Sequence, residues 1–167
     1  MSPNNYTDYL KRQYPQIESV AAFYAEQGAE NPLNWALAEC KGEPALATFV
    51  FTQALRAEIT PAGSLDWAVQ VSQGELNVED AQLLQQAAAA LQHLQERGVD
   101  LARLTPLVRA LQTQTVRTIA GLLDEGPAIA CLPLPADRPA HWALYAVDAQ
   151  DRPQTPLAGL HALLDGL

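Results

Sequence analysis

The sequence predicts an α+β fold that is predominantly α, with a bundle of αα-hairpins first and a small C-terminal strand–strand–helix unit. Three observations predict it. Apolar residues recur at helical spacing through most of the first 127 residues, between glycine and proline breaks. A pattern of a short helix, a glycine turn and a longer helix is predicted twice. Residues 128–148 then change to short runs typical of strands.

Size and charge limit the function classes. The 167 residues predict one domain, in which residues 1–127 form the helical bundle and residues 128–167 a ββα unit packed on it. The net charge is -9, and most of the acidic excess lies in the first 96 residues. This balance argues against nucleic acid and against an anionic membrane surface. It favours a basic protein partner or simple solubility.

The compartment is predicted from what the sequence lacks. The N-terminus has no apolar core of a signal peptide, and no apolar run of ~18 residues could span a bilayer. The two cysteines, Cys40 and Cys131, belong to no CxxC pair. We therefore expect a cytoplasmic protein whose thiols are free.

Two helices are expected before residue 43. The first covers residues 4–27, with Pro15 marking its true start or a kink. Its apolar side is the set Ile17, Val20, Ala21 and Tyr24. In the second, Asn31 is the expected N-cap, Pro32 occupies the first turn, and Gly42 ends the helix.

The next helices follow the same punctuation. Residues 44–58 favour a helix, although residues 47–52 could form a strand. Ser64 is expected to cap a helix over residues 65–73. Asn77 is expected to open a helix that Gly98 closes. The apolar stripe of that helix is Leu84, Ala87, Ala88, Leu91 and Leu94.

A long helix and the C-terminal unit complete the chain. Thr105-Pro106 is expected to cap a helix that ends at Gly126-Pro127. Residues 128–134 and 140–148 are predicted strands on either side of a proline-rich turn. Thr155-Pro156 is expected to cap a final helix, whose apolar side is Leu157, Leu160, Leu163 and Leu164.

An internal repeat is the main organisational hypothesis. Residues 33–37 (LNWAL) resemble residues 65–69 (LDWAV) at an offset of 32, and Gly42-Glu43 matches Gly74-Glu75 at the same offset. The candidate copies are residues 31–59 and 63–91, each a helical hairpin with a tryptophan anchor. Chance similarity in a chain rich in alanine, leucine and glutamine is the alternative. The tetratricopeptide consensus is not met.

Three polar residues on the long helix form the first candidate binding set. Arg109, Thr113 and Arg117 are spaced i, i+4, i+8, so they share one face of a helix. In an otherwise acidic protein this face could hold an anion or contact an acidic partner. It could also pair with nearby carboxylates and remain an ordinary solvated surface.

Histidine and cysteine patterns predict neither a metal nor a cofactor. No HxxxH or HExxH occurs; His161 and Asp165 could share a helical face, but a metal site would need His93 or Asp124 as well. Cys131 and His141 could be read as nucleophile and base. The apolar run around the cysteine favours a buried structural thiol instead.

The second predicted strand supplies the remaining binding candidates. His141, Trp142 and Tyr145 lie on a segment that is apolar on both faces and needs two covers. The final helix or a third strand could supply the second cover, or a second copy of the chain could pair through residues 128–148. The protein is therefore expected to be a monomer or such a homodimer.

These observations favour a non-catalytic binding or regulatory protein that acts on a protein partner, in the manner of an adaptor, immunity protein or chaperone. Paired helical hairpins commonly build concave binding surfaces, and no catalytic motif is present. One alternative is an enzyme with a site between the long helix and the C-terminal unit, lined by Arg109, Arg117, His141 and His161. Another is a structural homodimer.

Overall fold

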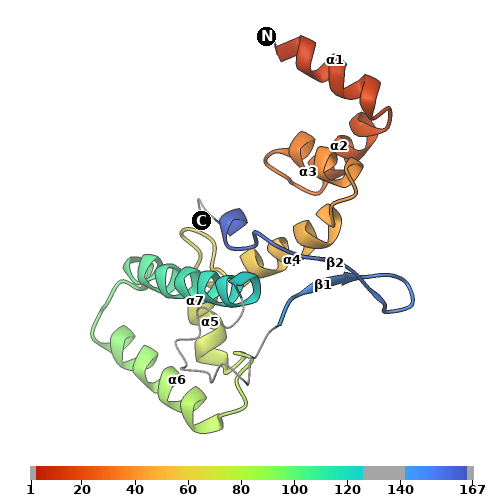
Figure 1. Ribbon diagram of the computed structural model, residues 1–167. Coiled ribbons are helices and arrows are strands. Elements are labelled where there is room, and N and C mark those ends of the chain that lie inside the picture. Colours follow the sequence, from red (N-terminus) through yellow and green to blue (C-terminus); the bar gives the residue numbers. More distant parts are fainter. Residues whose placement is uncertain (1–2, 126–141, 165–167) are drawn as a thin grey trace. The chain divides into compact units, whose positions relative to one another are not determined.

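The computed structural model describes residues 3–125 and 142–164 (Figure 1). In chain order they form α1 (Pro3–Gln13), α2 (Ile17–Glu26), α3 (Pro32–Cys40), α4 (Ala45–Ala57), α5 (Asp66–Gln73), α6 (Ala81–Glu96), the 3-10 helix η1 (Leu101–Arg103), α7 (Thr105–Glu125), β1 (Tyr145–Val147), β2 (Pro153–Pro156) and the 3-10 helix η3 (Ala162–Leu164). The predominantly α, α+β fold class is thus confirmed. None of the helices in these residues combines the length and hydropathy needed to cross a membrane.

The chain divides into two compact units, which are described separately here. The terminal unit comprises residues 1–54 and 120–166, and the middle unit comprises residues 55–119. The boundaries lie inside α4 and α7, so each of these helices contributes to both units.

An aromatic cluster forms the centre of the terminal unit. The Tyr24 ring of α2 stacks on Trp35 of α3 at 5.9 Å between centroids, and Phe49 of α4 packs edge-on against both rings at 5.2 Å. The Tyr24 hydroxyl donates to Glu39 Oε2 at 2.6 Å. Burial, together with this hydrogen bond, raises the pKa of Tyr24. Residues 45–57 are helical, so the strand alternative for residues 47–52 is wrong.

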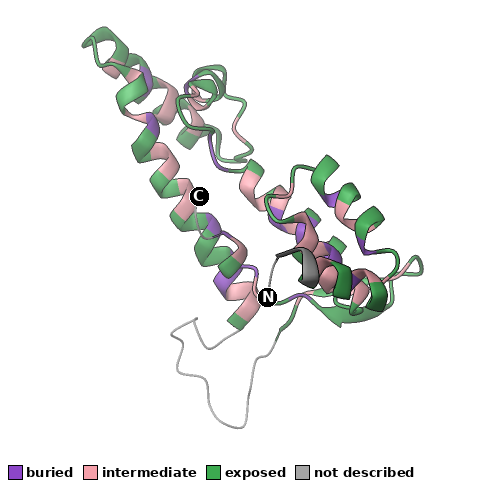
Figure 2. Ribbon diagram, turned by 90° about the horizontal axis from the view of Figure 1, so that it is seen from above, coloured by how far each residue is buried: buried purple, intermediate pink, exposed green. Residues whose placement is uncertain are grey.

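The N-terminal segment is two helices rather than one. Around Pro15 the helix is interrupted, because proline cannot donate a backbone hydrogen bond; α1 ends at Gln13 and α2 begins at Ile17. Of the ten residues of α2, the four that are not exposed are the predicted apolar set, Ile17, Val20, Ala21 and Tyr24. Figure 2 shows the same general pattern, with buried, intermediate and exposed residues alternating along the helices. The predicted face is therefore confirmed, whereas Pro15, predicted as the true start or a kink of one helix, lies between two helices.

The middle unit contains the helix pair α5 and α6, which pack together. Gly74 ends α5 in the left-handed region at φ +68°, as glycine can without strain. The prediction that Asn77 opens the next helix is wrong. Asp80 is the N-cap, and its carboxylate accepts from the backbone N–H groups of Gln82 and Leu83 at 2.9 and 3.0 Å.

The apolar stripe of α6 is confirmed, because its five predicted residues are the ones in this helix that are not exposed. Both candidate repeat copies contain a short helix, a glycine with positive φ and a longer helix. The short helices start at Pro32 and Asp66, 34 residues apart, and the longer ones at Ala45 and Ala81, 36 apart. The sequence offset is 32, so the helices are not in strict register, and the repeat stays a prediction.

At the C-terminal end the structure corrects the sequence interpretation. Residues 153–156 form β2, antiparallel to β1, with Tyr145 opposite Pro156 and Val147 opposite Pro153. The predicted α-helix from Thr155-Pro156 is wrong: Gly159 has φ +75°, which an α-helix excludes, and the helical turn η3 covers Ala162–Leu164. The predicted strand 128–134 lies outside the described residues.

The burial predicted for this segment nevertheless holds. Leu157, Leu160 and Leu164 are buried, and Leu163 is partly so. Residues 142–144 precede β1 without regular secondary structure, although the Leu144 carbonyl accepts from the Leu157 N–H at 2.7 Å. The described strand is therefore shorter than the predicted 140–148. The apolar residues were thus identified correctly, but their conformation was not.

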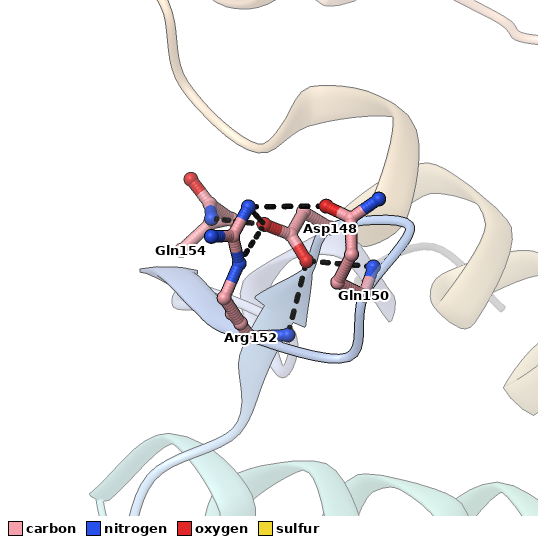
Figure 3. A network of polar contacts seen from close by, with 4 residues as sticks. All are labelled: Asp148, Gln150, Arg152 and Gln154. Atoms are coloured by element: carbon pink, nitrogen blue, oxygen red, sulfur yellow. Dashed lines mark hydrogen bonds and ion pairs between the residues drawn. The ribbon is translucent and has the colours of Figure 1, made fainter.

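The turn between β1 and β2 is organised by one carboxylate (Figure 3). Asp148 accepts from the backbone N–H groups of Gln150 and Arg152, and from the Arg152 Nε and Gln154 Nε2 side-chain groups. These hydrogen bonds, above all that from the Arg152 side chain, hold the pKa of Asp148 below its usual range. Asp151 adopts φ +58° within this turn.

Candidate functional site

The residues with the clearest site geometry lie in the middle unit, where a loop is bonded to the first half of α7. The Arg109 guanidinium donates from Nη1 to the Thr60 carbonyl at 2.5 Å, and the Thr60 N–H donates to Gln112 Oε1 at 2.9 Å. These two bonds fix the loop before α5 against α7. Thr60 is buried, and a buried backbone group without a partner would be destabilising. These two bonds supply partners for both its N–H and its carbonyl.

Thr105 makes a second connection to the same loop. Its hydroxyl donates to the Ser64 carbonyl and accepts from Trp67 Nε1, both at 3.1 Å. The Thr105 side chain is 1% exposed. The sequence interpretation treated it as a helix cap, whereas its hydroxyl joins α7 to Ser64 and to α5.

Between this loop and α7 lies an open groove of about 900 Å³. All three predicted residues, Arg109, Thr113 and Arg117, line it. The other lining residues are Ala62, Gly63, Ala102, Thr105, Pro106, Ala110, Gln114 and Thr118. The structure therefore brings the predicted polar face together in one concave surface, and we call this surface the α7 groove.

Among the residues that the structure describes, none that lines the α7 groove is a carboxylate, although the chain has a net charge of -9. From residue 101 to residue 119 the sequence has three arginines and no aspartate or glutamate. Arg109 is half-buried, and its bond to the Thr60 carbonyl fixes its guanidinium in place. Such an arrangement can bind an anionic group through charge-assisted hydrogen bonds.

A second polar arrangement belongs to the terminal unit, at the last turn of α7. Asp124 Oδ2 lies 2.6 Å from His161 Nδ1 and accepts from the His161 backbone N–H at 2.9 Å. The Asp124 side chain is 5% exposed, whereas that of His161 is 45% exposed. A buried carboxylate thus orients an accessible imidazole, whose Nε2 can accept or donate a proton.

The metal hypothesis for this region required a third ligand. Within residues 3–125 and 142–164, no group of three or more histidine, cysteine, aspartate or glutamate residues could hold a metal ion. Asp165 lies outside the described residues, so the His161–Asp165 pairing is not described.

The other predicted site residues are not part of the α7 groove. Trp142 donates from Nε1 to the Leu122 carbonyl at 2.7 Å, and its side chain remains 43% exposed. Tyr145 lies in β1 and is 46% exposed. His141 is outside the described residues. Arg109 and Arg117 belong to the middle unit, whereas His161 belongs to the terminal unit.

A cavity that sequence reasoning missed lies in the terminal unit. It measures about 600 Å³ and is formed by α3, the start of α4 and the segment after β2, with Asn31, Asn34, Trp35 and Thr48 among its lining residues. The sequence carried no signal for it, because these residues read as a helix cap and a core. Its walls meet only through tertiary packing.

Comparison with known protein families, with curated proteins and with solved structures yields no match to this chain.

Proposed function

We propose that this protein is a non-catalytic binding protein that acts on another protein, and that the middle unit carries the contact surface. The observation that supports this most directly is on α7. Leu107 and Leu111 are each 58% exposed and lie one helical turn apart on α7. Residues seven apart lie on the same side of a helix, so these leucines share a side with Gln114 and Thr118, which line the α7 groove. Exposed large apolar side chains beside a concave surface are a common feature of protein-binding sites.

The rest of the middle unit supports the same proposal. Further large apolar side chains are exposed there at Leu65, Val69, Val78, Leu83, Val99 and Ile119. Single exposed apolar residues are ordinary on any protein, but here they accompany few buried ones. The buried apolar residues of this unit are Ile59, Ala68, Leu91 and Val116. A partner would remove part of the exposed apolar surface from water.

The net charge of the chain favours a basic protein as the partner. A chain of net charge -9 attracts a protein that is basic overall, and this attraction accelerates encounter rather than specifying the contact. Leu107, Leu111 and the groove beside them would make the specific contact.

Photo-crosslinking tests this proposal. A photoreactive amino acid is placed at Gln114, which is exposed in the α7 groove, in the full chain expressed in its native cells. The matched control carries it at Gln86, an exposed position of α6 outside the groove. We expect one partner protein to be crosslinked from position 114 and not from position 86. The adduct should be lost when Leu107 and Leu111 are both changed to serine.

Two outcomes would contradict the proposal. Equal crosslinking from positions 114 and 86 would show that the groove is not a contact surface. Adducts only with a second copy of the chain would support the structural homodimer instead. Circular dichroism of the double serine variant must show an unchanged melting curve, as expected for two exposed positions.

A further inference from the structure

The cavity of the terminal unit follows one side of α3, and we call it the α3 cavity. Asn31, Asn34, Trp35 and Ala38 line it, and their spacing of three to four residues places them on a common side of the helix. Its other walls come from the start of α4 and from residues 155–163 of the same unit. The volume of about 600 Å³ lies in the range usual for small-molecule sites, about 300–1,000 Å³.

The middle of the α3 cavity is apolar. Trp35 and Leu163 are its large apolar lining residues, and both are partly buried. The Trp35 ring is held in place by Tyr24 and Phe49, at 5.9 and 5.2 Å between ring centroids. The remaining apolar lining consists of small side chains and prolines, at Ala38, Pro44, Ala45, Pro156 and Ala158. Such a fixed apolar wall can contact an apolar ligand body without rearranging.

The polar groups of the α3 cavity lie toward the two ends of α3. Asn31 and Asn34 belong to its first turn, whereas Glu43 follows its last residue, Cys40. The six residues from Asn34 to Cys40 correspond to a rise of about 9 Å. The cavity therefore offers two carboxamides toward one end of the helix and one carboxylate toward the other.

These polar side chains are not used by the fold. Asn31 is the N-cap residue of α3, yet its side chain makes no capping hydrogen bond. Within the part of the chain that the structure describes, no hydrogen bond or ion pair engages the side chains of Asn31, Asn34 or Glu43. Their oxygen atoms are therefore available to accept hydrogen bonds from a ligand.

Charge at the Glu43 end favours a cation. Glu43 is the one charged residue among the described lining residues, and Lys41, which is exposed, is not part of the lining. The last carbonyl groups of α3 also carry partial negative charge at this end. Residues 18–43 contain five glutamates and one lysine, so the surrounding surface attracts positive charge as well.

The rim of the α3 cavity favours a small molecule over a protein segment. Its exposed lining residues are polar or small, namely Asn31, Asn34, Glu43, Thr155, Pro156 and Ala158. No large apolar side chain in the described lining is exposed, in contrast to Leu107 and Leu111 beside the α7 groove. Protein contacts usually centre on such side chains.

We propose that the α3 cavity binds a small elongated organic amine. Its ammonium group contacts Glu43, its apolar body lies along Trp35, and a neutral polar group at its far end bonds to Asn31 and Asn34. This site belongs to the terminal unit and is separate from the protein contact proposed for the middle unit.

Isothermal titration calorimetry on the full chain tests the charge preference with three probes that share one apolar body. Phenylbutylamine is cationic at neutral pH, phenylbutanol is neutral and phenylbutyrate is anionic. We expect the amine to bind about fivefold more tightly than the alcohol, the usual upper effect of one exposed ion pair. The butyrate should bind most weakly, because its charge has the same sign as that of Glu43.

Two pairs of variants locate the site. Glu43→Gln should weaken amine binding about fivefold and leave alcohol binding unchanged, whereas Glu26→Gln, the same charge change at an exposed position of α2, should stay within about twofold. Ala158→Leu places a larger side chain in the cavity and should weaken both probes about tenfold. Ala162→Leu is its control, at an exposed position of η3 outside the lining.

The Asn end is tested by adding a para-hydroxyl group to the ring of phenylbutylamine. This group should strengthen binding to the wild-type protein and give no gain in Asn34→Ala, which removes an exposed carboxamide. An equal gain in both proteins would contradict the assigned orientation.

The proposal is overturned if phenylbutylamine does not bind, if the alcohol or the butyrate binds as tightly, or if Glu43→Gln and Glu26→Gln have equal effects. Tighter binding of a blocked tripeptide with a central lysine would overturn it in favour of a protein segment. If Ala158→Leu has a lower melting temperature, the Glu43→Gln and Glu26→Gln comparison still decides. None of these results depends on crosslinking from position 114, so the two proposals can fail separately.

Discussion

The terminal and middle units are built around different centres. In the terminal unit Ile17, Tyr24 and Leu160 are completely buried, and three aromatic rings contact one another. In the middle unit the least exposed side chain is that of a threonine, Thr105 at 1%, while its most buried apolar side chain, Leu91, is 4% exposed. One centre is apolar, and the other is a polar connection between helix and loop.

The difference concerns the source of stability. Burying a large apolar side chain contributes about 1.5–3 kcal/mol, whereas an intramolecular hydrogen bond contributes a net of about 0.5–1.5 kcal/mol. The terminal unit buries several such side chains, and the middle unit fewer. The middle unit therefore leaves more of its large apolar side chains exposed to solvent. The hydrogen bonds of Thr105, Arg109 and Thr60 hold its loop against α7.

The largest effect is expected at the aromatic cluster. Phe49→Ala removes a ring that contacts both Tyr24 and Trp35, and should lower the free energy of unfolding by about 3–5 kcal/mol. Leu83→Ala, at a position 51% exposed in the middle unit, should change it by less than about 0.5 kcal/mol. Urea denaturation measures both. Comparable losses would mean that the two units do not differ as described.

The next effect tests the polar centre of the middle unit. Thr105→Val keeps the shape of the side chain but leaves the Ser64 carbonyl and Trp67 Nε1 without their partner, at a cost of about 1–3 kcal/mol. The control Thr115→Val removes an exposed hydroxyl that bonds only within α7, and should cost about 0.5 kcal/mol or less. The Trp67 emission spectrum should shift in the first variant alone.

Tyr24 gives a smaller effect with a distinctive pH dependence. Tyr24→Phe loses the hydrogen bond to Glu39, and should cost about 1 kcal/mol at neutral pH, whereas Tyr9→Phe, at an exposed site, should cost almost nothing. Because the folded-state pKa of Tyr24 is raised, the unfolded chain ionises first as the pH passes about 10. The stability contributed by this tyrosine is therefore complete below that pH and declines above it.

Urea midpoints of wild type and Tyr24→Phe, measured from pH 7 to pH 11, test this. The difference between the two proteins should shrink as the pH rises above about 10. A constant difference across the whole range would contradict the assigned pKa direction.

The smallest effect is expected at the exposed hairpin turn. Asp148→Asn removes the ion pair with Arg152 and should loosen the turn without a measurable change in the melting of the chain.

The same turn should also respond to pH. Because the pKa of Asp148 is lowered, the carboxylate's contribution to the turn is present above the ordinary aspartate pKa, about 3.9, and is lost as the pH falls below it. NMR shifts of Tyr145 and Val147 should report both changes. Asp151→Asn, at φ +58°, should leave them unaltered, since asparagine tolerates this conformation.

Local patterns predicted several features correctly. The buried sides of α2 and α6 followed from helical spacing alone, because a helix that packs by one face must repeat its apolar residues with the helical period. The common face of Arg109, Thr113 and Arg117 followed from the same rule. Gly74 was identifiable as a helix end, since it can adopt a left-handed conformation that other residues avoid.

Other features depended on contacts between distant residues, and no local pattern encodes these. The spacing of Leu157, Leu160 and Leu164 is equally consistent with a helix and with an irregular buried segment; the pairing of β2 with β1 and the φ of Gly159 decided between them. The Asp124–His161 contact joins residues 37 apart in sequence.

For this protein, the sequence by itself determined where most helices lie, which faces they bury and that arginines 109 and 117 share one side of a helix in an acidic chain. Tertiary structure alone decided that this side is concave. The wall opposite the arginines comes from Ala62 and Gly63, in a loop held by the Thr60 and Ser64 carbonyls. Periodicity reports only what a segment does along its own axis, whereas a groove requires a second segment to be bonded at a particular place beside it.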